Sequence, residues 1–523
     1  MLETALNWVL RAALLAFGAG ALIALLRWMS QAIRERRERW AIRLAIGMLM
    51  FAAIYAFGHA RMLMQAEELE EGRLAWRRFG DPRESERNRG EVRGWIMDCT
   101  NEPANALARY GVRDGEVQRV YPLGEGGANL IGGGTGDDDR NYTVERVFAR
   151  HLRKPLSFAE QGQLHPVGTD LQLTICSAPM RRAWSLLQQT GLNGAIIVQD
   201  VNTGALVAYA ATGKADEPPF GIKRYAPPGS VFKLALAALW WENNLPEMEM
   251  GCPPEIQVGR ARIRNFESSS YPSLQVPREM LRYSCNTAAV QMANYARQRL
   301  GAEAFHDAYK RFGFLTYSEG PPSAAEKGFW NTENEAWAER MTPPPSRVRL
   351  LQRFNQHEWG QIAIGQGPVD VTPLSVSRFI QSIGNGGVML PPTIEADRLN
   401  NLPEGTRVMK QTTSQKLMQA MLLVVDSGTA ASAQPRLAGT GWDMGGKTGS
   451  ADVAGRARAD GWFAGLMFDP ERRPRYTVVV YLQSGAPGGR IPAAIGAEMT
   501  RFMASQARAQ DRGEDQAAAR KED

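Results

Sequence analysis

The chain has 523 residues, enough for about two to four domains, and its 44% hydrophobic and 22% charged residues exclude a wholly disordered protein. A formal net charge of +6 is too small over this length to indicate nucleic-acid binding. Four cysteines are too few for a disulfide scaffold, and the sequence has no Cys-x-x-Cys, His-Glu-x-x-His or Gly-x-Ser-x-Gly motif. We therefore expect no metal or cofactor, no nucleic-acid partner, and neither a zinc protease nor an α/β-hydrolase.

Two apolar runs open the chain, at residues 12–26 and 44–58. Each is shorter than the roughly 20 residues of a typical membrane-spanning helix. Flanking arginines can extend to the membrane surface, and tryptophans near the ends of the runs are typical of the interface. We predict two transmembrane helices within residues 1–60; the alternative is one span preceded by an interfacial helix.

The segment between the two runs is rich in arginine, and the positive-inside rule therefore places it in the cytoplasm. A cleaved signal peptide fits poorly, because the first ten residues contain no basic side chain. We expect a protein of the cytoplasmic (inner) membrane whose remaining chain lies on the periplasmic or extracytoplasmic side.

Residues 61–92 are rich in charges of both signs and are predicted to form a juxtamembrane stalk. Residues 93–166 are rich in glycine and are predicted to form a small β-rich pedestal domain. Asp137, Asp138 and Asp139 lack the regular spacing of a calcium loop and are interpreted as a solvated loop.

Residues 167–505 are predicted to form the main domain. Residues 195–200 and 205–209 read as one β-hairpin, and residues 462–468 and 476–482 as a second. Strands at both ends of this region, with helices between them, indicate an α+β fold with an antiparallel sheet.

Two helical segments complete this interpretation. Residues 230–241 are apolar apart from Lys233, which predicts a helix buried on all sides. A second helix is expected from Ile491 to about Met503. Residues 506–523 lack apolar periodicity and are predicted to be a disordered tail.

Three short motifs carry the candidate chemistry: Ser230-Val-Phe-Lys233, Ser284-Cys-Asn286 and Lys447-Thr448-Gly449. The first two are individually weak signals, but all three together form a fairly specific set.

Ser230 follows Pro-Pro-Gly and is expected to open the buried helix, with Lys233 on the same face beneath its hydroxyl. A serine hydroxyl is a poor nucleophile unless a neighbouring group accepts its proton. Burial lowers the pKa of a lysine toward neutrality, so Lys233 can act as that base. The alternative is a helix cap beside a stray buried lysine, which is costly when unpaired.

The three motifs resemble those of class B penicillin-binding proteins, the monofunctional peptidoglycan D,D-transpeptidases. The resemblance extends over most of the chain from Arg93 onward. It includes Gly365-Gln-Gly367 and the strand segment Gly461-Trp-Phe-Ala-Gly465. It implies the penicillin-binding-protein and serine β-lactamase type of transpeptidase fold.

The resemblance also implies roles for individual residues. Ser230 would attack the penultimate D-Ala of a peptidoglycan stem peptide, with Lys233 as base. Ser284 would relay the proton to the leaving D-Ala, and Asn286 would hold the substrate amide; a helix N-cap is the alternative for these two residues. The remaining roles concern the carboxylate and the oxyanion: Lys447 and Thr448 would bind the terminal carboxylate, Gly449 would let substrate approach the strand, and the N–H groups of Ser230 and Ser450 would form the oxyanion hole.

Two cysteines depart from the family pattern, in which an arginine is usual at Cys99 and an aspartate at Cys176. We hypothesise that a disulfide replaces this charged pair, the alternative being two separately buried thiols. Cys252 and Cys285 form a second, less supported candidate pair.

A P-loop nucleotide hydrolase is an alternative from an unrelated class. Gly441 to Thr448 satisfies the P-loop pattern of nucleotide hydrolases, but no predicted strand precedes it and no helix follows it. We therefore do not expect a P-loop.

Functions of the same fold are closer alternatives: a D,D-carboxypeptidase, a membrane-bound β-lactam sensor, a β-lactamase, or an inactive scaffold. The complete set of motifs argues against a scaffold. The resemblance further implies β-lactam binding and a polytopic SEDS-family glycosyltransferase as partner.

Overall fold

The computed structural model describes residues 93–113, 116–133, 142–153, 168–213, 217–317, 328–350, 355–484 and 487–522, with a few isolated positions before residue 60. The chain divides into two compact units, Met1–Gly90 and Glu91–Asp523. The predicted spans and stalk lie outside the described residues except at those isolated positions. Within the described part of the chain, no helix combines the length and apolar character needed to cross a membrane.

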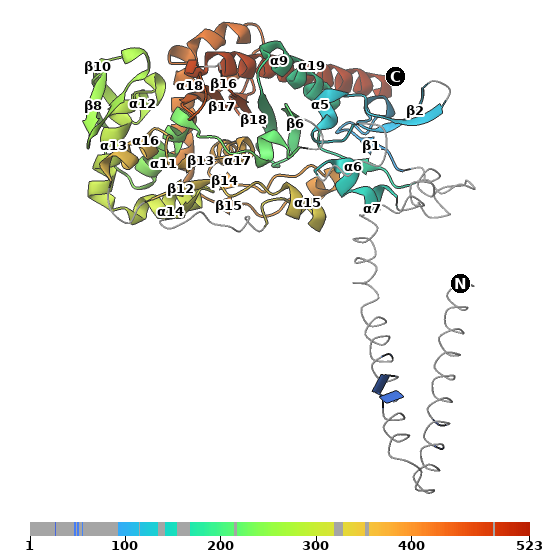
Figure 1. Ribbon diagram of the computed structural model, residues 1–523. Coiled ribbons are helices and arrows are strands. Elements are labelled where there is room, and N and C mark those ends of the chain that lie inside the picture. Colours follow the sequence, from blue (N-terminus) through green and yellow to red (C-terminus); the bar gives the residue numbers. More distant parts are fainter. Residues whose placement is uncertain are drawn as a thin grey trace, which may run out of the picture. The chain divides into compact units, whose positions relative to one another are not determined.

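A five-stranded antiparallel sheet forms the centre of the second unit (Figure 1). Its strands, in spatial order, are β16 (Asp443–Ala451), β17 (Asp460–Phe468), β18 (Pro474–Leu482), β5 (Gly194–Asp200) and β6 (Leu206–Ala211). Both predicted hairpins are confirmed, and β18 pairs with β5 to join them into one sheet. The predicted α+β class with an antiparallel sheet is therefore confirmed.

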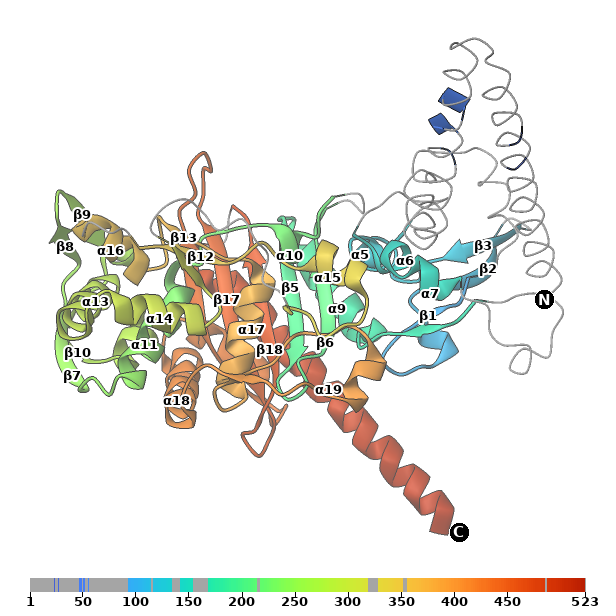
Figure 2. The ribbon, with the colours of Figure 1, turned by 90° about the horizontal axis from the view of Figure 1, so that it is seen from below.

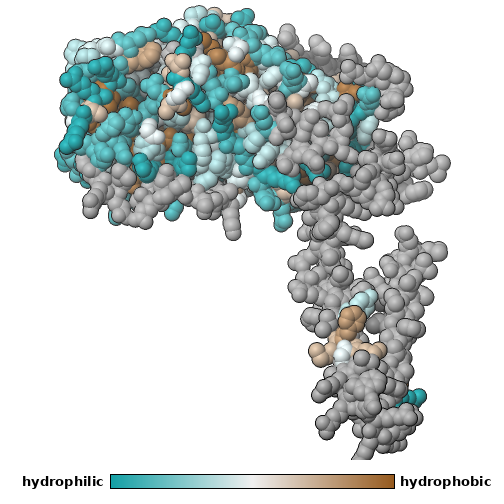
Figure 3. Space-filling view, in the orientation of Figure 1, coloured by the Kyte–Doolittle hydropathy of each residue, from teal (hydrophilic) through white to brown (hydrophobic). Residues whose placement is uncertain are grey.

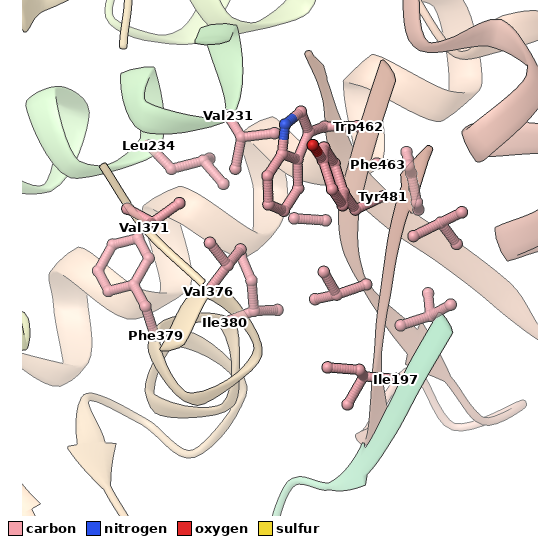
Figure 4. Packing of buried hydrophobic residues seen from close by; sticks show 14 of the residues in the cluster. Ile197, Val231, Leu234, Val371, Val376, Phe379, Ile380, Trp462, Phe463 and Tyr481 are labelled. Atoms are coloured by element: carbon pink, nitrogen blue, oxygen red, sulfur yellow. The ribbon is translucent and has the colours of Figure 1, made fainter. Parts of the chain in front are cut away.

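Helices cover both faces of this sheet. On one face α9 (Ser177–Thr190) and α19 (Arg490–Glu522) pack against each other and on the strands. On the other face lie α10 (Phe220–Lys223) and α17 (Pro373–Gly384) (Figure 2). Figure 4 shows Trp462 and Tyr481, from β17 and β18, beside Val231, with Ile380 of α17 nearby. These side chains are buried, so the main core lies between the sheet and its helices.

A largely helical region lies beyond the β16 edge of the sheet (Figure 2). Its helices are α11 (Lys233–Glu242), α12 (Arg278–Tyr283), α13 (Asn286–Leu300), α14 (Glu303–Arg311), α16 (Gln356–Ala363) and α18 (Gln411–Ser427). Short strands complete this region: β7 (Met248–Cys252), β8 (Glu255–Val258), β9 (Ala261–Arg264) and β10 (Tyr271–Val276). The predicted buried helix is confirmed, since every residue of α11 is buried, and it begins with a 3-10 turn, Gly229–Phe232.

The segment predicted to be a pedestal belongs to the same compact unit as the sheet. Its strands are β1 (Ile96–Met97), β2 (Arg109–Arg113) and β3 (Glu116–Val120), and its helices are α5 (Glu125–Ala128), α6 (Val144–Val147) and α7 (Ala149–Leu152). It therefore contains short helices as well as the predicted strands. β1 pairs with β4 (Leu171–Gln172), and a disulfide joins Cys99 to Cys176 at the start of α9, which confirms that hypothesis. The Asp137–Asp139 segment lies outside the described residues.

Short elements connect these regions: β11 (Leu315–Tyr317), α15 (Glu335–Met341), β12 (Arg347–Arg349), β13 (Val369–Asp370), β14 (Val388–Met389) and β15 (Thr406–Arg407). The prediction of a disordered tail is wrong, because α19 continues to Glu522. Residues after 504 are rich in Ala, Gln, Arg and Glu, which are strong helix formers, so a helix forms without an apolar stripe. The described surface visible in Figure 3 is mainly hydrophilic.

Candidate active site

Ser230 lies in the 3-10 turn that leads into α11, and backbone atoms of two other segments hold this turn. Gly229 adopts a left-handed φ of 53°, and its N–H donates to Gly365 O at 2.9 Å. A Cβ atom at Gly229 would lie 2.1 Å from Ser450 O, which only glycine avoids. The turn carrying Ser230 is therefore fixed between the Gly365 segment and strand β16.

Lys233 is fully buried at the start of α11, and its Nζ lies at the junction of α12 and α13. Nζ donates to Ser284 O at 2.6 Å, to Asn286 Oδ1 at 2.7 Å and to Ser284 Oγ at 3.3 Å. The first two predicted motifs thus meet at one nitrogen atom. The hydrogen bonds that fix Lys233 go to the second motif, whereas the sequence placed Lys233 directly beneath Ser230.

Burial is the main cause that holds the pKa of Lys233 well below its usual value, and the nearby Lys447 lowers this pKa further. A neutral lysine amine has two N–H groups and one lone pair. In the neutral amine the two shortest contacts use the two N–H groups, so the longer contact with Ser284 Oγ falls to the lone pair, which can accept a hydroxyl proton. Lys233 is therefore suited to act as a general base.

Ser284 ends α12 in a left-handed conformation, with φ 57° and ψ 32°. This conformation is unfavourable for residues other than glycine and is typical of functional sites. Asn286 is the first residue of α13, and its Nδ2 donates to Arg264 O at 2.7 Å. The N-cap of α13 is Cys285, so neither Ser284 nor Asn286 has the alternative role of N-cap.

Asn265 supports this junction and was not found from the sequence. Its buried Oδ1 accepts from the N–H groups of Asn286 at 2.9 Å and Thr287 at 3.1 Å. Its Nδ2 donates to Pro253 O at 2.8 Å and Ser269 O at 2.7 Å. No local motif signals this role, because Asn265 lies 21 residues before the helix end that it caps.

Lys447 and Thr448 lie in the middle of the edge strand β16. A P-loop is excluded, because no helix begins at Thr448. Lys447 is fully buried, donates to Thr448 O at 3.1 Å, and has its pKa lowered by burial to about 7. A bound carboxylate would favour the charged form of this lysine.

The rest of the third motif also lies at this edge. Thr448 Oγ1 is 2.6 Å from Thr429 Oγ1, in the loop after α18. Ser450 Oγ accepts from Gly488 N at 2.6 Å. A Cβ atom at Gly449 would lie 2.8 Å from Pro228 O, so the close approach at Gly449 is to the Ser230 turn of this chain. The packing of the Ser230 turn is therefore a reason for glycine at this position in addition to the expected approach of substrate.

The described residues contain no cluster of His, Cys, Asp or Glu side chains able to hold a metal ion. The chemistry of the site is that of a serine, two buried lysines and their hydrogen-bonding partners. A serine in the turn that opens a helix, a buried lysine three residues later, a Ser-x-Asn turn and an edge strand with Lys-Thr-Gly together define the penicillin-binding class of α+β domains.

Comparison with known proteins agrees with this class. Residues 194–501 match the family described as penicillin binding protein transpeptidase domain, and the chain belongs to this family.

Relatives with similar sequences carry corresponding names. Peptidoglycan D,D-transpeptidase PbpA of Mycobacterium tuberculosis is 24% identical over 403 residues, which cover 68% of this chain and 76% of that protein. Probable peptidoglycan D,D-transpeptidase PenA of Neisseria gonorrhoeae is 25% identical over 418 residues, or 72% of this chain and 65% of that protein.

A solved structure shows the same fold. Penicillin-binding protein A from M. tuberculosis, in its penicillin G acyl-enzyme complex, aligns with a TM-score of 0.61 at 22% identity. The alignment covers 80% of this chain and all of that chain.

Proposed function

We propose that this protein is a peptidoglycan D,D-transpeptidase that cross-links stem peptides through an acyl-enzyme on Ser230. One observation carries the proposal: Lys233 Nζ, a buried amine with a lowered pKa, forms hydrogen bonds with both Ser284 and Asn286. The relatives named as peptidoglycan D,D-transpeptidases support the same reaction.

In the acylation step, Ser230 Oγ attacks the carbonyl carbon of the penultimate D-Ala and its proton passes to Lys233. The C–N bond to the terminal D-Ala breaks, and that amine receives the proton through Lys233 and Ser284. The backbone N–H groups of Ser230 and Ser450 stabilise the developing oxyanion. The close packing of Gly229 on Ser450 supports this pairing.

In the second step, an amine from another stem peptide attacks the ester carbonyl, the bond to Ser230 Oγ breaks, and the proton lost by the amine returns to Oγ through Lys233. Lys447 and Thr448 bind the carboxylate of the donor peptide, and Asn286 orients its amide. β-Lactams acylate the same serine in place of the donor peptide. The penicillin G acyl-enzyme of the M. tuberculosis relative supports this last assignment.

The proposed location is the cytoplasmic membrane, with residues 1–60 as anchor, residues 61–92 as stalk and residues 93–166 as a pedestal outside the cytoplasm. Disulfides are typical of oxidising compartments, so the bonds Cys99–Cys176 and Cys252–Cys285 favour this orientation. The anchor is proposed to contact a SEDS-family glycosyltransferase. Protease treatment of intact spheroplasts tests the orientation: cleavage within residues 93–505 is expected, and complete protection would contradict it.

Labelling with fluorescent penicillin tests the acylation step. The full-length protein in detergent is expected to become labelled, and Ser230→Ala is expected to remain unlabelled. Ser505→Ala, at an exposed position on α19, is the matched control and is expected to label normally. Equal labelling of wild type and Ser230→Ala would refute the assignment. Incubation with stem-peptide donor and acceptor then separates cross-linking from simple removal of the terminal D-Ala.

A further inference from the structure

We propose that the Cys252–Cys285 disulfide is a positioning element of the active site, which holds Ser284 and Asn286 where they accept the hydrogen bonds of Lys233. The proposal rests on the function given above, because it concerns the acylation of Ser230. Nothing in the three catalytic motifs requires a disulfide at this place.

The position of Cys285 carries the argument. Cys285 is the residue between Ser284 and Asn286, and Lys233 Nζ lies 2.6 Å from Ser284 O and 2.7 Å from Asn286 Oδ1. Its Sγ also accepts from Ala288 N at 3.2 Å, as the N-cap of α13. A displacement of Cys285 therefore moves both acceptors of the base at once.

The other end of the bond lies on a fixed strand. Cys252 is fully buried at the end of β7, where it pairs with Tyr271 of β10. Cys252 Sγ lies 3.2 Å from Asn265 Nδ2, the same side chain that caps α13 through its Oδ1. The disulfide thus ties the turn at Ser284 to the β7–β10 ladder.

This turn needs such a restraint because Ser284 is in the left-handed region. A strained backbone persists only where its surroundings fix it on more than one side. Tyr283 stacks on Tyr271 with ring centroids 4.4 Å apart, immediately before Ser284. The disulfide restrains the chain immediately after Ser284, so the strained residue is held from both sides.

The alternative is that the bond stabilises the fold and nothing more. The second disulfide, Cys99–Cys176, is a matched control for this alternative, because it lies outside the catalytic motifs. It closes a loop of 77 residues, against 33 for Cys252–Cys285. A longer closed loop gives at least as large an entropic stabilisation of the fold.

The experiment compares Cys252→Ser/Cys285→Ser with Cys99→Ser/Cys176→Ser in the full-length protein. Serine keeps a hydrogen-bonding side chain at the N-cap and removes only the covalent link. The rate of acylation by fluorescent penicillin is measured as a function of pH. The first variant is expected to react at least about tenfold more slowly, since small misplacements of catalytic groups have effects of this size or larger. The acid limb of its rate-against-pH profile is expected to move to higher pH. Water that reaches Lys233 would reduce the effect of burial and so raise the pKa of this lysine. The control is expected to match the wild type in both respects.

Acylation by the first variant within about twofold of the control, or a slower rate with an unchanged acid limb, would overturn the proposal. If the first variant does not fold, Cys99→Ser/Cys176→Ser is treated with dithiothreitol. Cys252–Cys285 is then its one remaining disulfide, and alkylation with mass spectrometry measures the opened fraction. The acylation rate is expected to fall in proportion to that fraction, and a constant rate would overturn the proposal. If the wild-type protein is labelled no better than Ser230→Ala, the proposed function is itself wrong, whatever the role of the disulfide.

Discussion

Thr429 and Thr448 are joined by a hydrogen bond of 2.6 Å between their hydroxyl oxygens. Thr448 lies on β16, whereas Thr429 belongs to the loop after α18. The N–H of Thr429 donates to Arg282 O at 3.2 Å. Arg282 is on α12, two residues before Ser284. Thr429 therefore connects the strand that is proposed to bind the substrate carboxylate with the helix that precedes the proton-relay serine.

This connection predicts the effect of Thr429→Val. The substitution keeps the shape of the side chain but removes the hydroxyl partner of Thr448. We expect the KM for a carboxylate-bearing donor peptide to rise about tenfold, with a smaller change in kcat, because loss of a buried hydrogen-bond partner costs about 1–3 kcal/mol. Steady-state kinetics of Thr429→Ser, which keeps the hydroxyl, provide the control. An unchanged KM in Thr429→Val would contradict the proposed role.

Lys233→Arg tests the need for a base that can lose its proton. Arginine keeps the positive charge but stays protonated, so it cannot accept the proton of Ser230. We expect acylation by penicillin to fall by at least about 10²-fold, the usual size of a general-base contribution. Lys416→Arg, on the surface of α18, is the control and should label normally. Acylation of Lys233→Arg at a rate near that of wild type would refute the assignment of the base.

The pair of buried lysines predicts how the acylation rate depends on pH. Because Lys447 lowers the pKa of Lys233, an uncharged residue at 447 should raise that pKa. In Lys447→Met, the acid limb of the profile of acylation rate against pH is therefore expected to move to higher pH, even if the maximal rate also changes. Lys447→Arg keeps the charge and is expected to keep the position of the limb. A limb at the wild-type position in Lys447→Met would show that the two lysines do not interact.

The same lysine predicts a gain in stability. The pKa of Lys447 is about 7 in the folded protein and 10.5 in its ordinary environment. Between these values the unfolded state binds a proton that the folded state lacks, so the stability of the wild type increases as the pH rises. Lys447→Met lacks this penalty and is expected to be more stable at neutral pH, with the advantage disappearing near pH 10.5. Denaturant midpoints measured across this range provide the check; an advantage that does not change with pH would contradict it.

Sequence patterns were sufficient for four of the five strands of the sheet, for the buried helix and for the three motifs. Alternating and continuous apolar segments mark β5, β6, β17, β18 and α11 directly. The motifs are short and contain the reacting side chains themselves. The contacts of Lys233 Nζ with Ser284 and Asn286, which join the first two motifs, were not predicted from the sequence.

The contacts that hold the site together were not predictable in the same way. Asn265 caps a helix that begins 21 residues later, and Thr429 reaches Thr448 from another element. The left-handed conformation of Ser284 has no local glycine or turn motif to signal it. These features arise from tertiary packing. For the tail, the sequence analysis missed a helix. Apolar periodicity indicates burial and does not measure helix propensity, so its absence does not indicate disorder.

The packing around Gly229 limits which positions can change under selection by β-lactams. Gly229 touches both Gly365 and Ser450 through main-chain atoms. A Cβ atom at Gly229 would lie 2.1 Å from Ser450 O, and one at Gly365 would lie 2.1 Å from Gly229 O. A contact between main-chain atoms cannot be changed in small steps by replacing one side chain with another. We therefore expect variants with altered drug susceptibility to change side chains that bear on the site from the next layer, such as Thr429 and Asn265, while both glycines stay fixed.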